Sequence, residues 1–451
     1  MGGDSWIRRC LSAVLASGLV LASAGCRRKA PADLVIVSPH HKNVQSEFER
    51  AFREWHKKKF GSDVRVEWLD RGGSSAITRS LINEYKTADS SGIDLYFGGG
   101  GPDHKYLTAN GITVPVKLPD EIMAQLPETI GGVRQYDGQG RWYGAAVSCV
   151  GILYNAKLLK ANKLPIPQTW GDLAAPALFG RIEAADASES GSARLAYEMI
   201  VQSAADWPAG WAKLLKIYGN SKRFTGAAGD VVTDVAYGEV LAGAAIDFYA
   251  FTQLAQYGQD LGFVAVAGTT AFTPDPISLL KGAPHPEAAK RFMEFVLSVP
   301  GQALWCLPPG GDGPALHALY RQPIRRDVYE KYKGKMLAPL VDPFEKSGAF
   351  KLDEAAAEIR ISRLHGPLMT AAAIDNAAAL SKAWKAVLDA GDSDRGRALM
   401  KEFTALPADL ADEAAALATA GKLADPGQRL TLTRAWQEFF HQKYKRIAAG
   451  P

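Results

Sequence analysis

The stretch LVIVSPHHKNVQSEFERAFREWHKKKFGSDVRVEWL, residues 34–69, decides the fold class. Its first four residues form a continuous apolar run, typical of a parallel strand that is buried on both faces. Apolar residues then recur at about four-residue spacing, which predicts an amphipathic helix: they are Val44, Phe48, Phe52 and Trp55. Gly61 ends this helix, and residues 64–69 alternate as a second strand. Strand, helix and strand in this order form the building unit of an α/β sheet.

The same alternation of strands and helices continues along the chain, and glycine- or serine-rich turns follow the strands. Gly73-Ser74-Ser75 opens a second helix, and residues 93–97 predict a strand that the glycines at 98–101 end. Further strands are predicted at 143–154, 180–185, 244–248 and 263–267, and further helices from Ser192 onward, at 231–241 and at 286–297. The chain is therefore expected to be an α/β protein.

The last hundred residues differ in composition from the rest of the chain. From 352 to 451 the sequence is rich in Ala, Leu, Lys and Glu and poor in strand formers. The clearest helices are predicted at 355–361, 376–388 and 430–447. This segment is expected to be a helical extension that packs on the main body or trails from it, and it carries no recognisable chemical motif.

Length and charge limit the function. With 451 residues, 47% of them hydrophobic and 22% charged, the chain is a globular protein too long for one ordinary core. The formal net charge is only +4, which argues against a nucleic-acid partner. An acidic small molecule is compatible with this charge but is not required by it.

The N-terminus has the layout of a secretory signal peptide. Arg8 and Arg9 precede an uncharged run, residues 10–24, that is too short and too rich in small residues for a membrane span. The segment ends in LASAGC, residues 21–26, which resembles a bacterial lipobox. This resemblance implies a lipid on Cys26, a signal peptide over 1–26 and a tether over 27–33. Ser23 stands where Leu is commonest, so ordinary cleavage after small residues stays open. Either way the protein is expected in the periplasm or at the cell surface, in the first case as a membrane-anchored lipoprotein.

Two cysteines, Cys149 and Cys306, lie beyond this segment, and no CxxC spacing suggests zinc. In an exported protein they could form a disulfide, but two separately buried thiols are the favoured interpretation.

Enzyme signatures are missing from the sequence. It contains no GxSxG, HExxH, Walker or dinucleotide-binding motif, so neither catalysis nor a cofactor is expected. An exported hydrolase remains an alternative, with Ser190, Asp247 and a histidine imaginable as a triad, although no spacing supports it. A second alternative is a ligand-sensing lipoprotein that uses its helical extension to bind a partner.

Seven segments in a fixed order carry a resemblance to a known family. They are LVIVSPHHKNV, GGSS, IDLYFGGG, RWYGAAVSCVGILYN, TWGDLAAPALFGRIEAADASESGSARLAYEMI, VAYGEVLAGAAIDFY and PDPISLLKGAPHPEAAKRFMEFVLSVPGQALW, between residues 34 and 305. In this order they resemble the extracellular solute-binding proteins of bacterial ABC transporters, in the branch that binds iron(III), polyamines, phosphonates or sugar phosphates. The resemblance does not cover the extension.

The resemblance implies a two-lobed type II periplasmic-binding-protein fold that closes on its ligand about a hinge. The chain would cross between lobes near 145–148 and return near 267–274. Lobe 1 would then comprise 34–144 and 268–351, and lobe 2 residues 145–267. The implied partners are a small-molecule solute and an ABC transporter permease.

Two serine-rich helix starts are the main candidates for ligand contact. Ser74 and Ser75 follow a Gly-Gly turn, and Ser190, Gly191 and Ser192 repeat the pattern in the other lobe. Free backbone N–H groups at a helix N-terminus favour an anion. Two facing starts would suit a phosphate ester, phosphonate or carboxylate, whereas plain N-capping is the alternative reading for each.

Five further residues follow predicted strands or lie on the crossing strand, where ligands bind in α/β sheets. They are Gly99, Ser148, Thr225, Asp247 and Tyr249. Gly99 would allow close backbone approach, and Asp247 and Tyr249 are expected to end a strand, with Asp247 able to pair with an ammonium group. Turn formation and strand-end capping explain these residues equally well.

The histidine pair His40-His41 raises the question of a metal. Iron(III)-binding relatives are marked by an adjacent pair of tyrosines, which this sequence lacks. No metal is therefore expected, iron(III) transport stays an alternative, and His40 is a candidate donor to an anionic ligand.

Overall fold

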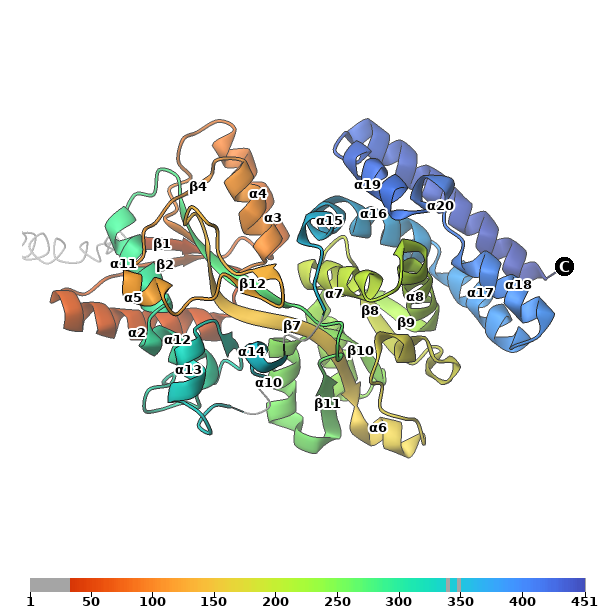
Figure 1. Ribbon diagram of the computed structural model, residues 1–451, viewed down its shortest axis with the longest axis horizontal. Helices are drawn as coiled ribbons and strands as arrows, with labels where there is room; N and C mark the ends of the chain where they lie inside the picture. The colour runs from red at the N-terminus through yellow and green to blue at the C-terminus, as the bar shows by residue number, and fades with distance from the viewer. Residues whose placement is uncertain (1–32, 338–340, 347–349, 451) are drawn as a thin grey trace, which may run out of the picture.

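The computed structural model describes residues 33–337, 341–346 and 350–450. The predicted signal peptide, Cys26 and most of the tether lie outside these ranges. Two α/β lobes lie side by side, and a helical extension flanks the second of them (Figure 1).

Lobe 1 begins with three parallel strands in the order β2-β1-β3, the first two of which form the strand-helix-strand unit that residues 34–69 predict. The strands are β1 (Leu34–Val37), β2 (Val66–Leu69) and β3 (Leu95–Phe97), and the helices between and after them are α2 (Lys42–Phe60), α3 (Ser74–Tyr85) and α4 (Gly101–Ala109). Gly61 closes α2 in the left-handed conformation, with φ 76°, that glycine adopts without strain. The apolar face of α2, including Phe48 and Phe52, packs into the lobe 1 core.

Two long strands cross between the lobes. They are β7 (Tyr143–Asn155) and β12 (Phe272–Leu280), which pair antiparallel along the first half of β7. The second half of β7 pairs with β10 (Ala242–Ile246) and β11 (Leu261–Val264). A single sheet, β2-β1-β3-β12-β7-β10-β8-β9, therefore runs through both lobes. Nearly every residue of β7 is buried, which explains its small and apolar composition.

Lobe 2 holds the parallel strands β8 (Ile182–Ala185), β9 (Ser221–Thr225) and β10. Its main helices are α7 (Gly191–Gln202), α8 (Trp207–Asn220), α9 (Ala228–Tyr237) and α10 (Asp247–Tyr257). Two expectations are wrong at this level. The predicted helix at 231–241 stops at Tyr237, because Gly238 turns left-handed. Asp247 and Tyr249 do not end a strand, because β10 stops at Ile246 and Asp247 begins α10.

Shorter elements complete the two lobes. They are β4 (Thr113–Val114), α5 (Asp120–Met123), β5 (Thr129–Ile130), β6 (Val133–Arg134), α6 (Ala156–Ala161), η1 (Trp170–Ala174), η2 (Pro176–Leu178), η3 (Gly258–Asp260), α11 (Pro286–Val296), α12 (Val299–Cys306), β13 (Gln322–Pro323), α13 (Arg326–Lys331) and α14 (Pro343–Lys346). Cys149 on β7 and Cys306 at the end of α12 are both buried free thiols, so they form no disulfide.

The C-terminal extension is helical, as its composition predicts. It contains α15 (Glu354–Ile359), η4 (Arg360–Leu364), α16 (His365–Met369), η5 (Thr370–Ile374), α17 (Ala377–Ala390), α18 (Asp394–Thr404), η6 (Ala408–Leu410), α19 (Glu413–Lys422) and α20 (Pro426–Ala449). Within the described residues, no helix combines the length and hydropathy that a bilayer crossing requires.

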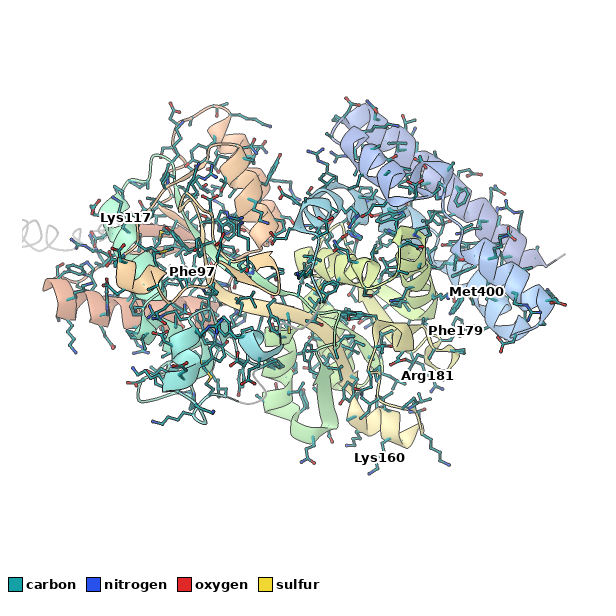
Figure 2. All side chains as sticks on the ribbon, viewed as in Figure 1. Phe97, Lys117, Lys160, Phe179, Arg181 and Met400 are labelled. Carbon is teal, nitrogen blue, oxygen red and sulfur yellow. The ribbon has the colours of Figure 1, made fainter. Side chains whose placement is uncertain are left out.

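The extension packs on lobe 2 and does not trail away from it. One apolar cluster contains Trp211 and Leu214 of α8 together with Trp384 and Phe403 of the extension. Figure 2 places Phe179 of lobe 2 and Met400 of α18 on neighbouring parts of the molecule, and both pack against this cluster. Lobe 2 and the extension therefore form one hydrophobic unit.

Candidate functional site

The turns that follow the strands gather at one edge of each sheet. β1, β2 and β3 are parallel, as are β8, β9 and β10, so the carboxyl ends of each group point the same way. Figure 1 shows α3 and α4, which follow these ends in lobe 1, on the side that faces α7 in lobe 2. This is the position at which α/β sheets bind ligands.

The starts of α3 and α7 meet across the space between the lobes. An ideal Cβ on Gly191, the first residue of α7, would lie only 3.5 Å from the Ser74 Oγ at the first residue of α3. Ser190 is the N-cap of α7, and its Oγ accepts a hydrogen bond from Ala193 N at 3.2 Å. The N-cap of α3 is Gly73, which provides no capping side chain. The amide end of α3 is therefore open to an outside acceptor.

Arg194 joins these two helix starts and was missed from the sequence. Its Nη2 donates to Ser75 Oγ at 2.8 Å, and its Nη1 donates to Ala187 O at 3.2 Å. Its buried Nε has no partner within the described part of the chain. The available signal was an arginine four residues after the N-cap Ser190, on the first turn of α7. A guanidinium there adds a permanent positive charge to two helix N-termini.

One carboxylate of lobe 1 also lies close to these helix starts. Asp103, on the first turn of α4, accepts a hydrogen bond from Thr78 Oγ1 at 3.0 Å. Burial raises the pKa of Asp103, although the charge of Arg194 and the hydroxyls of Thr78 and Ser74 act in the opposite direction. These side chains could therefore bind an anion at Arg194 and the helix starts, and a hydroxyl or ammonium group at Asp103.

Gly99 is a position that only glycine can occupy. Its φ is 93°, and a Cβ there would overlap Tyr96 Oη and come within 3.3 Å of Ser74 Cβ. The turn before α4 therefore lies against the start of α3. We call the set Ser74, Ser75, Gly99, Asp103, Ser190, Gly191, Ser192 and Arg194 the cradle.

His40 lies beside the crossing strand and makes no recorded contact with the cradle. Its Nε2 is 2.9 Å from Asp275 Oδ2 on β12, and Asp275 also pairs with Arg321. The ring packs edge-on against Phe97, and only 6% of the residue is exposed. Burial lowers the pKa of His40, although Asp275 acts against this shift. Contact between His40 and a ligand stays a prediction.

Ser148, Asp247 and Tyr249 also lie near the crossing strands. The buried Ser148 Oγ has no partner among the described residues. Asp247 accepts hydrogen bonds from Cys149 N at 2.9 Å, from Phe248 N at 2.8 Å and from Gln322 Nε2. Burial raises the pKa of Asp247 to about 6 despite these donors. Because Asp247 is 1% exposed and already bonded, its recorded contacts are structural, whereas Tyr249 is exposed.

Thr225 ends β9, one strand away from the cradle. Its carbonyl accepts a hydrogen bond from Asp186 N at 2.7 Å, which ties the end of β9 to the turn that leads into Ser190. The structure thus brings together Ser74, Ser75 and Gly99 of lobe 1 with Ser190, Gly191 and Ser192 of lobe 2, and it leaves Thr225 at their border.

Nowhere in residues 33–337, 341–346 and 350–450 do three His, Cys, Asp or Glu side chains form a group that could hold a metal ion.

Two lobes that share crossing strands, with helix N-termini facing each other between them, define a type II periplasmic binding protein. The chain belongs to the family described as "Bacterial extracellular solute-binding protein", whose model matches residues 54–336.

Similar proteins include both curated relatives and solved structures. The Phosphoglycerate transport regulatory protein PgtC of Salmonella typhimurium is 33% identical over 159 residues, which are 35% of this chain and 39% of PgtC. The periplasmic binding protein AfuA of Actinobacillus pleuropneumoniae, solved with exogenous fructose-6-phosphate bound, is 19% identical with a TM-score of 0.58 over 72% of this chain and 93% of AfuA. Iron-bound HitA of Pseudomonas aeruginosa is 18% identical with a TM-score of 0.55 over 73% of this chain and 98% of HitA. Both solved structures share the fold of this chain.

Proposed function

We propose that this protein is the substrate-binding component of an ABC importer and captures a small anionic solute by closure of its two lobes. The solute is a phosphate ester, phosphonate or carboxylate. The protein does no chemistry on it and delivers it to a transporter permease.

The observation that carries this proposal is the meeting of α3, α7 and Arg194 between the lobes. Two helix N-termini and a guanidinium combine partial and full positive charge at one point, and both lobes contribute to it. An anion there would be held from both sides, so its binding would favour the closed conformation. Asp103 supports a solute that carries a hydroxyl group besides its anionic group.

The relatives support the same chemical class. PgtC is named for phosphoglycerate transport, and AfuA was solved with fructose-6-phosphate. Both names refer to phosphate esters that also bear hydroxyl groups. Iron-bound HitA has a similar fold and keeps iron(III) as an alternative solute.

A second candidate function is ligand sensing. PgtC, which is 33% identical to part of this chain, is named a transport regulatory protein. A sensor would use the same cradle but would pass its closed state to a partner protein instead of a permease. The ligand chemistry is common to both candidates.

A thermal-shift screen tests the solute class. Because a ligand that binds only the folded protein raises its stability by mass action, a phosphate ester should raise the melting temperature in a concentration-dependent way. The panel would contain 3-phosphoglycerate, fructose-6-phosphate, a phosphonate, a polyamine and ferric citrate, with inorganic sulfate as the control for charge. Stabilisation by ferric citrate alone would establish the iron alternative, and turnover of any ester would contradict a binding-only role.

We also propose that a lipid on Cys26 holds the protein at a membrane surface. The LASAGC sequence supports this proposal. The Cys26→Ser variant should move from the membrane fraction to the soluble fraction after cell lysis. Equal membrane association of the variant and the parent protein would contradict the anchor.

A further inference from the structure

The extension is fastened to lobe 2 immediately after it begins. The Gln202 side chain, at the end of α7, accepts a hydrogen bond from Asp353 N at 2.7 Å and donates one to Asp353 O at 3.1 Å. Six residues after Glu354, Arg360 pairs with Glu198 of α7 at 2.6 Å, and both side chains are buried. Residues 353–360 must therefore move with lobe 2.

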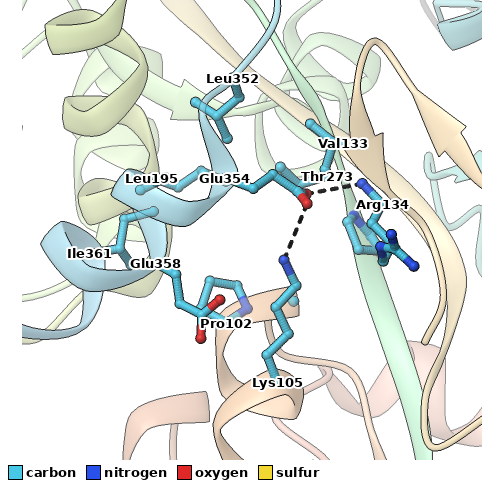
Figure 3. A pocket seen from close by; sticks show the side chains of 13 residues that line it. Pro102, Lys105, Val133, Arg134, Leu195, Thr273, Leu352, Glu354, Glu358 and Ile361 are labelled. Carbon is cyan, nitrogen blue, oxygen red and sulfur yellow. Dashed lines mark hydrogen bonds and ion pairs between the residues drawn. The ribbon is translucent and has the colours of Figure 1, made fainter. Parts of the chain in front are cut away.

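Between these two anchor points, Glu354 reaches across to lobe 1 (Figure 3). Its Oε1 accepts a hydrogen bond from Arg134 N at 2.9 Å, and its Oε2 lies 3.5 Å from the Nζ of Lys105 on α4. Lys105 belongs to the helix whose first turn carries Asp103. The contact thus links a segment that moves with lobe 2 to a helix that helps to form the cradle.

A pocket lies behind this contact, and residues of both lobes, the crossing strand and the extension line it. Lys105 and Arg134 come from lobe 1, Leu195 from lobe 2, Pro274 from the crossing strand, and Leu352 and Ile361 from the extension. Gly101, the first residue of α4, lines the same pocket, and Leu195 follows the cradle residue Arg194. The pocket therefore lies beside the cradle, and the two share no lining residue.

We infer that the start of the extension, residues 350–361, is a third wall of the space between the lobes, beside the cradle. Glu354 is a positioning residue that ties this wall to lobe 1 when the lobes are closed. Opening the cleft requires Glu354 to leave Lys105 and Arg134, because its own segment stays with lobe 2. That this wall helps to retain a solute rests on the proposed function. That Glu354 ties the two lobes together does not depend on it.

Hydrogen–deuterium exchange of the ligand-free protein tests the tie directly. The Glu354→Ala variant should open more often, so backbone amides at 98–104 and 187–194 should exchange faster than in the parent protein. Glu358→Ala is the matched control, because Glu358 lies one turn further along α15, lines the same pocket and has no recorded side-chain bond among the described residues. Exchange that is equal in the two variants would overturn the inference.

A binding measurement separates the tie from the solute. With 3-phosphoglycerate as the probe, Glu354→Ala should bind roughly 3- to 10-fold more weakly than Glu358→Ala, as expected for one partly exposed ion pair and one hydrogen bond. If the parent protein binds the probe and the two variants match it, the wall has no role in retention and the proposed function is untouched. If no variant binds the probe but Glu354→Ala exchanges faster, the tie stands and the proposed solute class is wrong.

Discussion

Arg194 Nη2 donates a hydrogen bond to Ser75 Oγ at 2.8 Å, and this bond joins the first turn of α7 in lobe 2 to the first turn of α3 in lobe 1. The guanidinium lies beside both helix starts, with Nη2 3.7 Å from the Cβ position of Gly191. Replacing Arg194 with Gln should weaken binding of a phosphate ester roughly 10- to 100-fold, since a hydrogen bond to a charged group contributes ~1.5–3 kcal/mol.

Isothermal titration calorimetry with 3-phosphoglycerate measures this loss. Arg181→Gln is the control, because Arg181 is an exposed arginine of lobe 2 whose side chain, among the described residues, bonds to Asn162 Oδ1 alone. Equal affinity of the Arg194 and Arg181 variants would contradict an anion site at the cradle.

Gly191 sets how closely the lobes approach each other. Its Cβ position is 3.5 Å from Ser74 Oγ, so a methyl group fits but a branched side chain would push the lobes apart. Gly191→Val should leave the stability of the ligand-free protein within ~0.5 kcal/mol, as for other surface substitutions, and should weaken ligand binding by about tenfold or more, ~1.4 kcal/mol.

The control is Gly421→Val in α19, where an added Cβ meets no atom within 4 Å. Calorimetry on both variants, together with their melting temperatures, separates closure from folding. A Gly191 variant that binds as tightly as the Gly421 variant would show that the two helix starts do not need to meet.

Glu198 should make the protein sensitive to acid. Burial by itself raises the pKa of this carboxyl, but the hydrogen bonds and charges of His365 and Arg360 lower it to about 2, from an ordinary value of 4.5. Because the pKa of Glu198 is lower in the folded than in the unfolded protein, ionised Glu198 stabilises the fold. This contribution is fully present above pH 4.5 and is lost as the pH falls from about 4.5 to about 2. A shift of this size corresponds to ~3 kcal/mol.

Urea unfolding between pH 2 and 5.5 measures how the free energy of unfolding depends on pH. In the Glu198→Gln variant this free energy should change less with pH than in the parent protein. At neutral pH the same variant should be less stable by ~3–5 kcal/mol, since it removes the buried carboxylate that pairs with Arg360 and His365 and leaves Arg360 only the exposed Glu413. Glu358→Gln, an exposed carboxylate on α15, should keep the slope of the parent protein. An unchanged slope in Glu198→Gln would contradict the assignment.

Trp384 tests whether the extension and lobe 2 fold as one unit. Its Nε1 donates to Asn220 Oδ1 at 2.6 Å, and its ring fills the space beside Gly219. Trp384→Ala should lower stability by ~3–5 kcal/mol, because it leaves a large cavity in the shared core. Leu430→Ala, at an exposed position of α20, should have little effect. Thermal unfolding checks both, and a loss confined to a separate transition of the extension would contradict a shared core.

The sequence by itself determined those features that depend on neighbouring residues. The apolar run 34–37, the four-residue spacing of α2 and the long run 143–154 were each predicted within a few residues, because periodicity and glycine stops act locally. The serine-rich helix starts at 74–75 and 190–192 were predicted for the same reason, and the helical character of the extension followed from its composition.

Only the tertiary structure decided which of these groups meet. It brought Arg194 to Ser75 across 119 positions of sequence and Glu354 to Arg134 across 220. It also enclosed Asp247 beside the crossing strand and decided that the extension, which the sequence left either packed or trailing, is part of the lobe 2 core. The physical reason is that contact between distant segments and the removal of water from a charge depend on how two lobes pack, and no local pattern in the chain encodes that packing.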